Sequence, residues 1–183
     1  MGTAYVFLAD GFEEIEALTP VDVLRRAGVD VRTVGVAGKM VTGSHDIRVE
    51  ADFDGDGFVL PRDAAMVILP GGGTGAKNLA ASAMVYAALK EAKNQDLYIA
   101  AICAAPGVLY KAGLLQGRRA TIFPGMEDEV PKADITGEAV VQDGKIITGR
   151  SMGVALAFSQ ALATALVGEE KAGEVVAKVY PEA

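Results

Sequence analysis

The sequence predicts an α/β fold in which helices cover both faces of a mostly parallel sheet. Short β-rich runs alternate with segments of helical periodicity along the 183 residues. Helical segments of this length imply right-handed crossovers between parallel strands. Near the end, EAVVQDGKIITG (138–149) has two alternating runs around an Asp-Gly pair, which indicates a small β-hairpin. No linker or internal repeat divides the chain, so residues 1–183 are expected to form a single domain.

Four apolar or alternating segments are predicted to be strands. AYVFLA (4–9) is too short and too rich in β-forming residues for a helix, and Asp10 and Gly11 close it. The other three are VDVRTVGVAG (29–38), MVILP (66–70) and DLYIAAIC (96–103). The carboxyl ends of these strands should therefore meet along one edge of the sheet.

Helical patterns lie between and after the strands. Residues 12–27 are predicted to form a helix that Asp10 and Glu13 cap, that Gly28 ends and that Pro20 kinks or breaks. Its predicted apolar face consists of Phe12, Ile15, Leu18, Val23, Leu24 and Ala27. Further helices are predicted at residues 79–94, 153–168 and 169–179.

The composition limits the functional classes. The net charge is −7 and no basic cluster exceeds a pair of arginines, which argues against nucleic acid as a partner. No uncharged apolar run approaches the roughly 20 residues of a membrane span, and the N-terminus has acids where a signal peptide has basic residues. We therefore expect a soluble cytoplasmic protein. Its single cysteine cannot form an internal disulfide and leaves a free thiol.

Cys103 is the first candidate for chemistry, because it ends the fourth predicted strand. Ligands of open α/β sheets bind outside the carboxyl ends of the strands. Pro106 suits the first turn of a following helix, so Cys103 would lie on a strand-to-helix elbow between small residues. Backbone N–H groups and the helix end would favour the thiolate there. The alternative is a buried cysteine that serves only as a small apolar side chain.

Two more candidate segments follow the first and third strands. The glycine-rich loop LPGGGTGAKN (69–78) can bring bare backbone N–H groups to an anion, and a tight turn without a ligand is the alternative. Glu13, Glu14 and Glu16 crowd the first turns of the first helix, where the helix dipole alone would favour acids. From its position, Glu16 could point either to solvent or across the strand ends toward Cys103.

Two parts of the sequence contain residue types that bind metal ions. The only histidine, His45, is predicted to be a surface loop residue away from the strand ends, so neither a Cys-His dyad nor zinc is expected. Residues 52–63 have the spacing of a calcium loop, but Pro61 interrupts its exit, so an acidic turn is expected and calcium is the alternative. The ligand positions of that loop would be Asp52, Asp54, Asp56 and Asp63, with Gly57 at the sixth place.

Four stretches together resemble a known family. They are ADGFEEIEALTPVDVLRRAG (9–28), LPGGGTGAKNL (69–79), AAICAAP (100–106) and GRSMG (149–153). In this order they resemble the ThiJ/PfpI superfamily, and within it the branch of the Parkinson-associated protein deglycase and its bacterial relatives. The resemblance runs over nearly the whole chain. It implies a flavodoxin-like, doubly wound fold, usually a homodimer, with a reactive cysteine at the elbow.

The resemblance also implies roles for single residues. The nucleophile falls on Cys103, and the acid that hydrogen-bonds it falls on Glu16. The N–H groups that line the anion pocket fall on Gly72 and Ala104, with Gly71 beside them as a further substrate-binding candidate.

Two departures from the family pattern bear on the chemistry. The peptidase-like branch has a histidine directly after the cysteine, where this chain has Ala104, so a peptidase is disfavoured. The human-type branch has a histidine before a proline, where TIFPG puts Phe123, an aromatic that bacterial members share. Glu16 would then handle the protons largely alone.

The function implied by the resemblance is that of a cofactor-free glyoxalase or deglycase with a stress-protective role. Its substrates would be methylglyoxal and glyoxal-type adducts of proteins and small molecules, with no metal or cofactor. The alternative is a redox sensor or chaperone, in which Cys103 is oxidised to a sulfinate rather than turned over.

Overall fold

The computed structural model describes residues 2–181 and confirms the α/β prediction. The strands of the main sheet are β1 (Thr3–Leu8), β2 (Val31–Gly35), β5 (Phe53–Asp54), β6 (Ala64–Leu69), β7 (Tyr98–Ile102), β10 (Val140–Asp143) and β11 (Ile146–Gly149). Two small sheets pair β3 (Met40–Thr42) with β4 (Arg48–Glu50) and β8 (Arg119–Ala120) with β9 (Asp134–Ile135). The four predicted strands and the predicted hairpin are all present.

The helices complete the alternation along the chain. They are α1 (Glu14–Arg26), α2 (Gly73–Ala81), α3 (Ala83–Asn94), α4 (Pro106–Lys111), α5 (Ala155–Val167) and α6 (Glu169–Val179), with the 3₁₀ turns η1 (Glu127–Glu129) and η2 (Met152–Val154). No helix among residues 2–181 combines the length and the apolar character that crossing a membrane requires.

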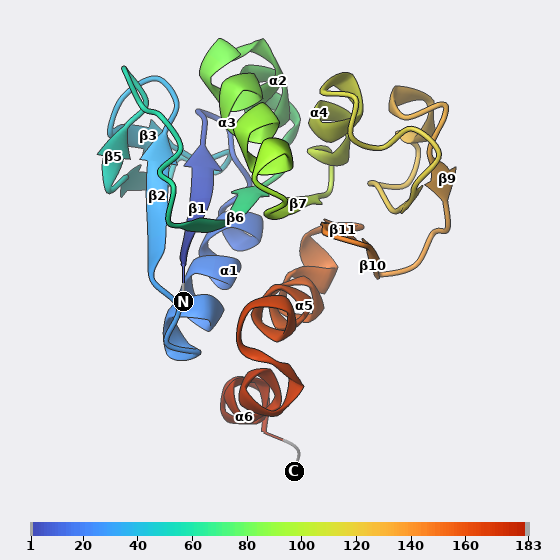
Figure 1. Ribbon diagram of the computed structural model, residues 1–183. Helices are drawn as coiled ribbons and strands as arrows, with labels where there is room; N and C mark the ends of the chain where they lie inside the picture. Colours follow the sequence, from blue (N-terminus) through green and yellow to red (C-terminus); the bar gives the residue numbers. More distant parts are fainter. Residues whose placement is uncertain (1, 182–183) are drawn as a thin grey trace.

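The sheet has the strand order β10-β11-β7-β6-β1-β2-β5 and is doubly wound (Figure 1). Every neighbouring pair is parallel except the hairpin β10–β11. β1 pairs with β2 on one side and with β6 on the other, so the direction of winding reverses at β1. Ligands of such sheets bind at this switch point, outside the carboxyl ends of the strands.

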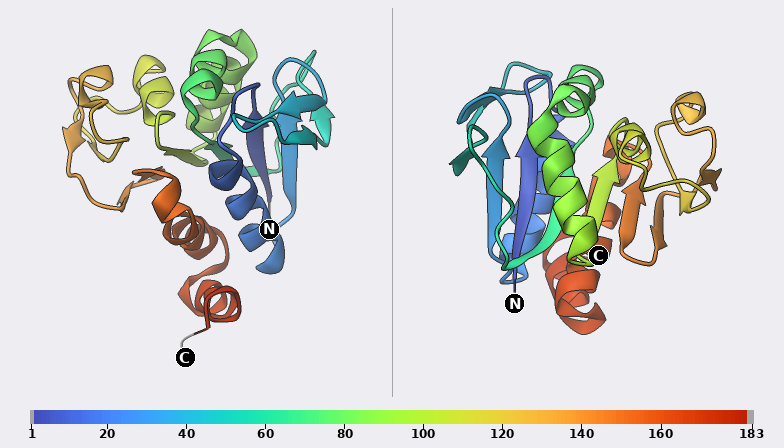
Figure 2. Two further views of the ribbon diagram at one scale, coloured as in Figure 1. Left: turned by 180° about the vertical axis from the view of Figure 1, so that it is seen from behind. Right: turned by 45° about the horizontal axis from the view of Figure 1, so that its top comes forward.

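Helices cover both faces of the sheet. α1, α5 and α6 lie together on one face, while α2, α3 and α4 lie on the other (Figures 1 and 2). Each face has its own apolar core: Phe7, Val67 and Leu89 belong to the α3 side, and Leu24 and Phe158 belong to the α1 and α5 side. Alternate residues of each strand supply the two cores, as the twofold repeat of a strand requires.

Three predictions for the first helix are wrong. α1 runs through Pro20 without a break, and its N-cap, Glu13, makes no side-chain capping bond. The Asp10 carboxylate instead accepts a hydrogen bond of 2.9 Å from the Thr42 N–H. Ile15, expected in the core, is half exposed, whereas Glu16 is fully buried. The buried face of α1 contains positions 16, 20 and 24, which are four residues apart and therefore lie on one side of the helix.

The helix predicted at residues 79–94 is two helices. It begins earlier, at Gly73, and breaks at Ser82, whose extended backbone separates α2 from α3. The Ser82 hydroxyl accepts a hydrogen bond of 3.4 Å from the Val85 N–H. Serine is a favoured N-cap because its oxygen satisfies an N–H group that the helix itself cannot pair.

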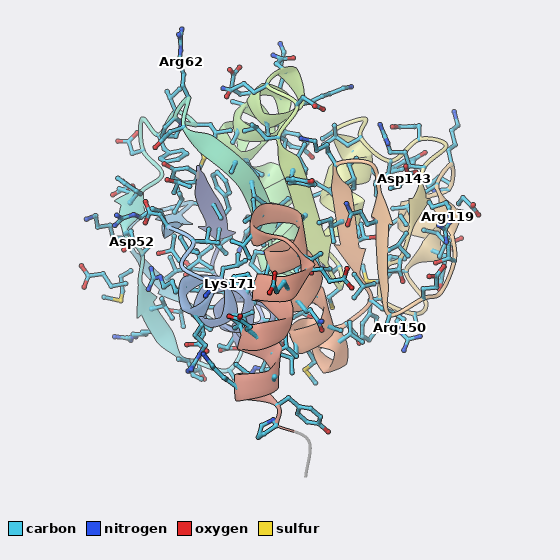
Figure 3. All side chains as sticks on the ribbon, turned by 60° about the horizontal axis from the view of Figure 1, so that its bottom comes forward. Asp52, Arg62, Arg119, Asp143, Arg150 and Lys171 are labelled. Carbon is cyan, nitrogen blue, oxygen red and sulfur yellow. The ribbon has the colours of Figure 1, made fainter. Side chains whose placement is uncertain are left out.

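The acidic segment 52–63 forms no calcium loop, so that alternative is wrong. The Asp52 carboxylate accepts hydrogen bonds from the Thr33 backbone and hydroxyl, at 2.8 and 3.1 Å, and pairs with Arg25 at 3.3 Å. Asp54 instead accepts from the Asp56 N–H at 3.0 Å. Figure 3 shows Asp52 at one edge of the sheet and Asp143 at the opposite edge. The Asp52 side chain thus anchors the short strand β5 against β2.

Removal of the α3 cap should lower the stability of the fold. We expect Ser82→Ala to reduce the free energy of unfolding by about 1 kcal/mol, because one N–H at the helix start loses its acceptor. Urea denaturation followed by circular dichroism measures the change. Ser82→Gly, which also adopts the cap conformation, should cost only a few tenths of a kcal/mol. Equal losses in both variants would contradict a capping role.

Candidate active site

Cys103 lies directly after β7 with a left-handed backbone, at a φ of +63°. Only a few per cent of residues other than glycine adopt positive φ, and such strain persists where the surrounding structure enforces it. Here two later segments enforce it. The Cys103 N–H donates to the Gly149 carbonyl at 2.9 Å, and the Cys103 carbonyl accepts from the Phe123 N–H at 2.9 Å. The predicted strand-to-helix elbow is therefore present.

Glu16 points inward from the first turn of α1 and is fully buried. Its Oε2 accepts a hydrogen bond of 3.0 Å from the Gly71 N–H. Among residues 2–181, no N–H or O–H group donates to Oε1. The Cys103 thiol lies close enough to this carboxyl for each group to shift the pKa of the other. The tertiary structure thus decides between the two alternatives for Glu16, in favour of Cys103.

The glycine loop allows Glu16 and Cys103 to meet. A Cβ atom at Gly71 would lie 2.5 Å from Glu16 Oε2 and 2.7 Å from Cys103 Cβ, so only glycine fits between them. The Gly71 N–H is engaged by Glu16 and is therefore not available to a substrate. Gly72 has a φ of +94°, and its N–H points at the Cys103 sulfur, as does the Ala104 N–H.

These groups border a cavity of about 350 Å³ that we call the Cys103 pocket. It is lined by Glu13, Glu16, Gly72, Gly73, Cys103, Ala104, Phe123, Met126 and Met152. The side chains of Phe123 and Met152 are about half exposed and form an apolar rim. A larger cavity, of about 450 Å³, lies at the amino ends of β7 and β11, but its lining residues include no cysteine, serine or threonine. The chemistry therefore points to the Cys103 pocket.

Cys103 and Glu16 shift each other's titration. Burial, the charge of the Glu16 carboxylate and the hydrogen bond to it raise the pKa of Cys103 to about 12, against the Gly72 and Ala104 N–H groups. Burial also raises the pKa of Glu16 to about 7, against hydrogen bonds from Cys103 and Gly71. The expectation that the elbow alone favours a thiolate is thus wrong, because the partial burial of Cys103 and the charge of Glu16 outweigh the two N–H groups.

The pair holds two protons below about pH 7 and one proton above it, and that single proton can lie on either group. When the proton is on Cys103, the charged carboxylate opposes ionisation of the thiol. When it is on Glu16, that opposing charge is gone and the two N–H groups stabilise the thiolate. The buried acid therefore controls the charge on the sulfur.

The sequence is similar to proteins of one known family over most of its length. Residues 2–165 match the DJ-1/PfpI family. The chain belongs to this family. Relatives over most of the chain include the Parkinson disease protein 7 homolog of Danio rerio, 39% identical over 178 residues, which are 95% of this chain and 94% of the relative. A protein of Pyrococcus abyssi (strain GE5 / Orsay) named as a deglycase is 29% identical over 150 residues, 81% of this chain and 89% of the relative.

Solved structures of the DJ-1/PfpI family agree with the fold. The structure of oxidized DJ-1 from Toxoplasma gondii has a TM-score of 0.92 and 34% identity, with 98% of both chains covered. The flavodoxin-like fold that the resemblance implies is therefore confirmed. The structure of this DJ-1/PfpI chain also brings together Cys103, Glu16, Gly72 and Ala104, the residues expected at the site.

The structure adds a polar cluster that the sequence did not reveal. Glu14 is buried and accepts from the His45 N–H at 2.8 Å and from Ser44 Oγ at 3.1 Å. His45 is exposed, as predicted, but its Nδ1 lies 3.0 Å from Glu14 and 3.8 Å from Glu13. It therefore lies beside the first strand end, not away from it. The cluster ties the β3–β4 loop to the start of α1.

The cluster of Glu13, Glu14 and His45 is the group of possible metal ligands found among residues 2–181, with ligand atoms within 4.8 Å of one another. Hydrogen bonds between His45, Ser44 and the two glutamates explain why these ligand atoms lie close together. Burial opposes ionisation of Glu14, but hydrogen bonds from His45 and Ser44 lower its pKa to about 2. The Glu14 hydrogen bond and the charges of both glutamates raise the pKa of His45.

Titration of His45 by nuclear magnetic resonance tests this cluster directly, since the chain has one histidine. We expect its ring protons to titrate above the usual pKa of 6.5. Glu14→Gln should move the midpoint down toward that value, because the main hydrogen-bonding carboxylate is lost. Glu13→Gln, which removes only a more distant charge, should lower it less. An unchanged midpoint in Glu14→Gln would contradict the assignment.

The raised pKa of Glu16 predicts a specific pH dependence of stability. Between pH 4.5 and about 7 the folded protein keeps a proton on Glu16 that the unfolded chain releases. The free energy of unfolding should therefore fall across this window, by an amount on the order of 3 kcal/mol, and Glu16 should add no further change above pH 7.

Urea titrations of the wild type and Glu16→Gln at several pH values up to 8 measure this contribution. The variant cannot ionise at this position, so the difference in unfolding free energy between the two proteins should change only between pH 4.5 and about 7. A difference that is constant over this range would show that Glu16 titrates normally.

Proposed function

We propose that this DJ-1/PfpI chain is a cofactor-free glyoxalase or deglycase that acts on methylglyoxal and on its adducts with thiols and amines. The observation that supports this most directly is the isolated pairing of a buried carboxyl with the sulfur of Cys103. Because Glu16 Oε1 is buried and has no hydrogen-bonding partner among the described residues, a proton on it is available to the reacting group. The relative from Pyrococcus abyssi that is named as a deglycase supports the same class of activity.

The reaction begins with the thiolate form of the pair, in which Glu16 holds the shared proton. The Cys103 sulfur attacks the aldehyde carbon of methylglyoxal, and the carbonyl oxygen becomes an oxyanion. The negative charge leaves the sulfur in this step, so the Gly72 and Ala104 N–H groups that faced the sulfur can hold the oxyanion beside it. Glu16 then donates its proton to that oxygen and gives a hemithioacetal.

The second half moves a proton between the two substrate carbons. The Glu16 carboxylate removes the proton from the carbon bound to sulfur and returns one to the neighbouring carbon, and the hydroxyl proton moves from the first oxygen to the second. The first carbon is thereby oxidised to a thioester and the second is reduced to an alcohol, so no external oxidant or reductant is needed. Water hydrolyses the thioester, which releases lactate and restores the Cys103 and Glu16 pair with its single proton.

A redox sensor is the second candidate function, and one observation favours it. The sulfur of Cys103 is only partly buried, and two N–H groups and an acid surround it. The same groups would hydrogen-bond the oxygens of a sulfinate. The Toxoplasma gondii relative is described as oxidized, which supports this chemistry in the family. The homodimer, the cytoplasmic location and the stress-protective role stay predictions.

Turnover by purified, reduced protein separates the two functions. We expect Cys103→Ser to lose lactate production from methylglyoxal entirely, and Glu16→Gln to lower kcat about 10²- to 10⁴-fold, because the proton transfers lose their acid and base. Asp22→Asn, an exposed charge change on the same helix, should leave kcat unchanged.

A wild-type rate no higher than that of a free thiol, with stable conversion of Cys103 to a sulfinate in peroxide, would reject the enzyme and favour the sensor. Mass spectrometry of the cysteine-containing peptide detects the two added oxygen atoms. Lactate production that survives in Cys103→Ser would reject the nucleophile in either case.

A further inference from the structure

A second cavity, of about 310 Å³, adjoins the Cys103 pocket. It runs between α2 and α4, and both cavities are lined by Gly73, Ala104 and Met126. A Cβ atom built at Gly73 would meet no atom within 4 Å, so the space at the junction is open. We call this second cavity the α2–α4 groove; α2 and α4 lie next to each other at the top of Figure 1.

Small side chains create the groove. Ala76 and Ala80 face it from α2, and Gly107 and Val108 face it from α4. Because none of these residues is large, the two helices leave an apolar space instead of a filled contact.

The charges along the combined cavity are unequal. Glu13 and Glu16 lie at the reacting end, in the Cys103 pocket. Lys77 and Lys111 lie along the α2–α4 groove. Among residues 2–181, Lys77 makes no ion pair, while Lys111 pairs at 3.4 Å with Glu129, the one acid that lines the groove. The acidic side chains therefore lie toward the reacting end, and the lysines of the groove can attract an anionic group away from it.

The size of the Cys103 pocket also indicates a substrate larger than a free dicarbonyl. Its volume of about 350 Å³ already exceeds what a three-carbon aldehyde fills, and cavities of roughly 300–1,000 Å³ suit much larger ligands. The adjoining groove adds further room on one side only. A substrate with a non-reacting extension would use both spaces.

We propose that the α2–α4 groove binds the carrier portion of a carboxylate-bearing adduct, with Lys77 as the main charge partner and Lys111 as the second. The carrier is a small thiol or amine whose carboxylate is separated from the reacting carbon by a short apolar chain. This inference rests on the proposed function, and it assigns Lys77 as a specificity-determining residue that takes no part in the chemistry.

Binding of a stable analogue tests the groove without any need for turnover. S-acetonyl-N-acetylcysteine keeps the ketone and the carboxylate of an adduct. It has a CH₂ group in place of the hemithioacetal carbon, so the Cys103 thiol cannot release its carrier. Its amide has the same size without the charge. We expect calorimetry to show that the reduced wild type binds the acid about two- to fivefold more tightly than the amide, as a partly exposed ion pair gives.

The variants locate the charge partner. Lys77→Gln should abolish the preference for the acid and Lys111→Gln should reduce it. Lys90→Gln, the same charge change on an exposed position of α3 outside the groove, should keep it. Equal binding of acid and amide to the wild type, or an undiminished preference in Lys77→Gln, would overturn the proposal. Methylglyoxal turnover measured in parallel keeps the two hypotheses apart, since Cys103-dependent turnover without a binding preference would reject the groove alone.

Discussion

The left-handed backbone at Cys103 is the constraint on which the site depends. Its N–H donates to Gly149, at the end of β11, and its carbonyl accepts from Phe123, in the connection after β8. Each of these segments is placed by the sheet or by its covering loops, so the conformation of one residue is fixed from both sides. The pairing of β7 with β11 directly before Cys103 holds the strained backbone in place. The strand order thus positions the sulfur.

The burial of Glu16 is the second element of the same design. A carboxyl without solvent and with one N–H donor resists ionisation, which destabilises the fold at neutral pH but keeps a proton beside the sulfur. Stability and reactivity are therefore in opposition at this position. Gly71 makes the arrangement possible, because the absence of a Cβ lets the carboxyl and the thiol approach each other beside the loop.

The side chains around the pair differ in charge from the α1 side of the pocket to the α2–α4 groove. Acids occupy the α1 side of the pocket, apolar side chains form its rim, and lysines line the groove between α2 and α4. The cluster of Glu14 and His45 anchors the loop on the acidic side and keeps the start of α1 in place. An asymmetric substrate would therefore enter in one orientation.

The sequence by itself determined the order of strands and helices, the elbow at Cys103 and the importance of the loop that contains Gly72, because apolar periodicity and turn residues are local signals. It could not decide the direction of Glu16, since a helix start with acids satisfies its dipole in either orientation. It also misplaced Ile15, because the burial of a helix residue depends on which side of α1 faces the sheet. The shared proton and the groove beside it arise from contacts between segments far apart in the chain. Only the tertiary structure decided these, because burial and charge pairing depend on what packs against a residue and not on its neighbours in sequence.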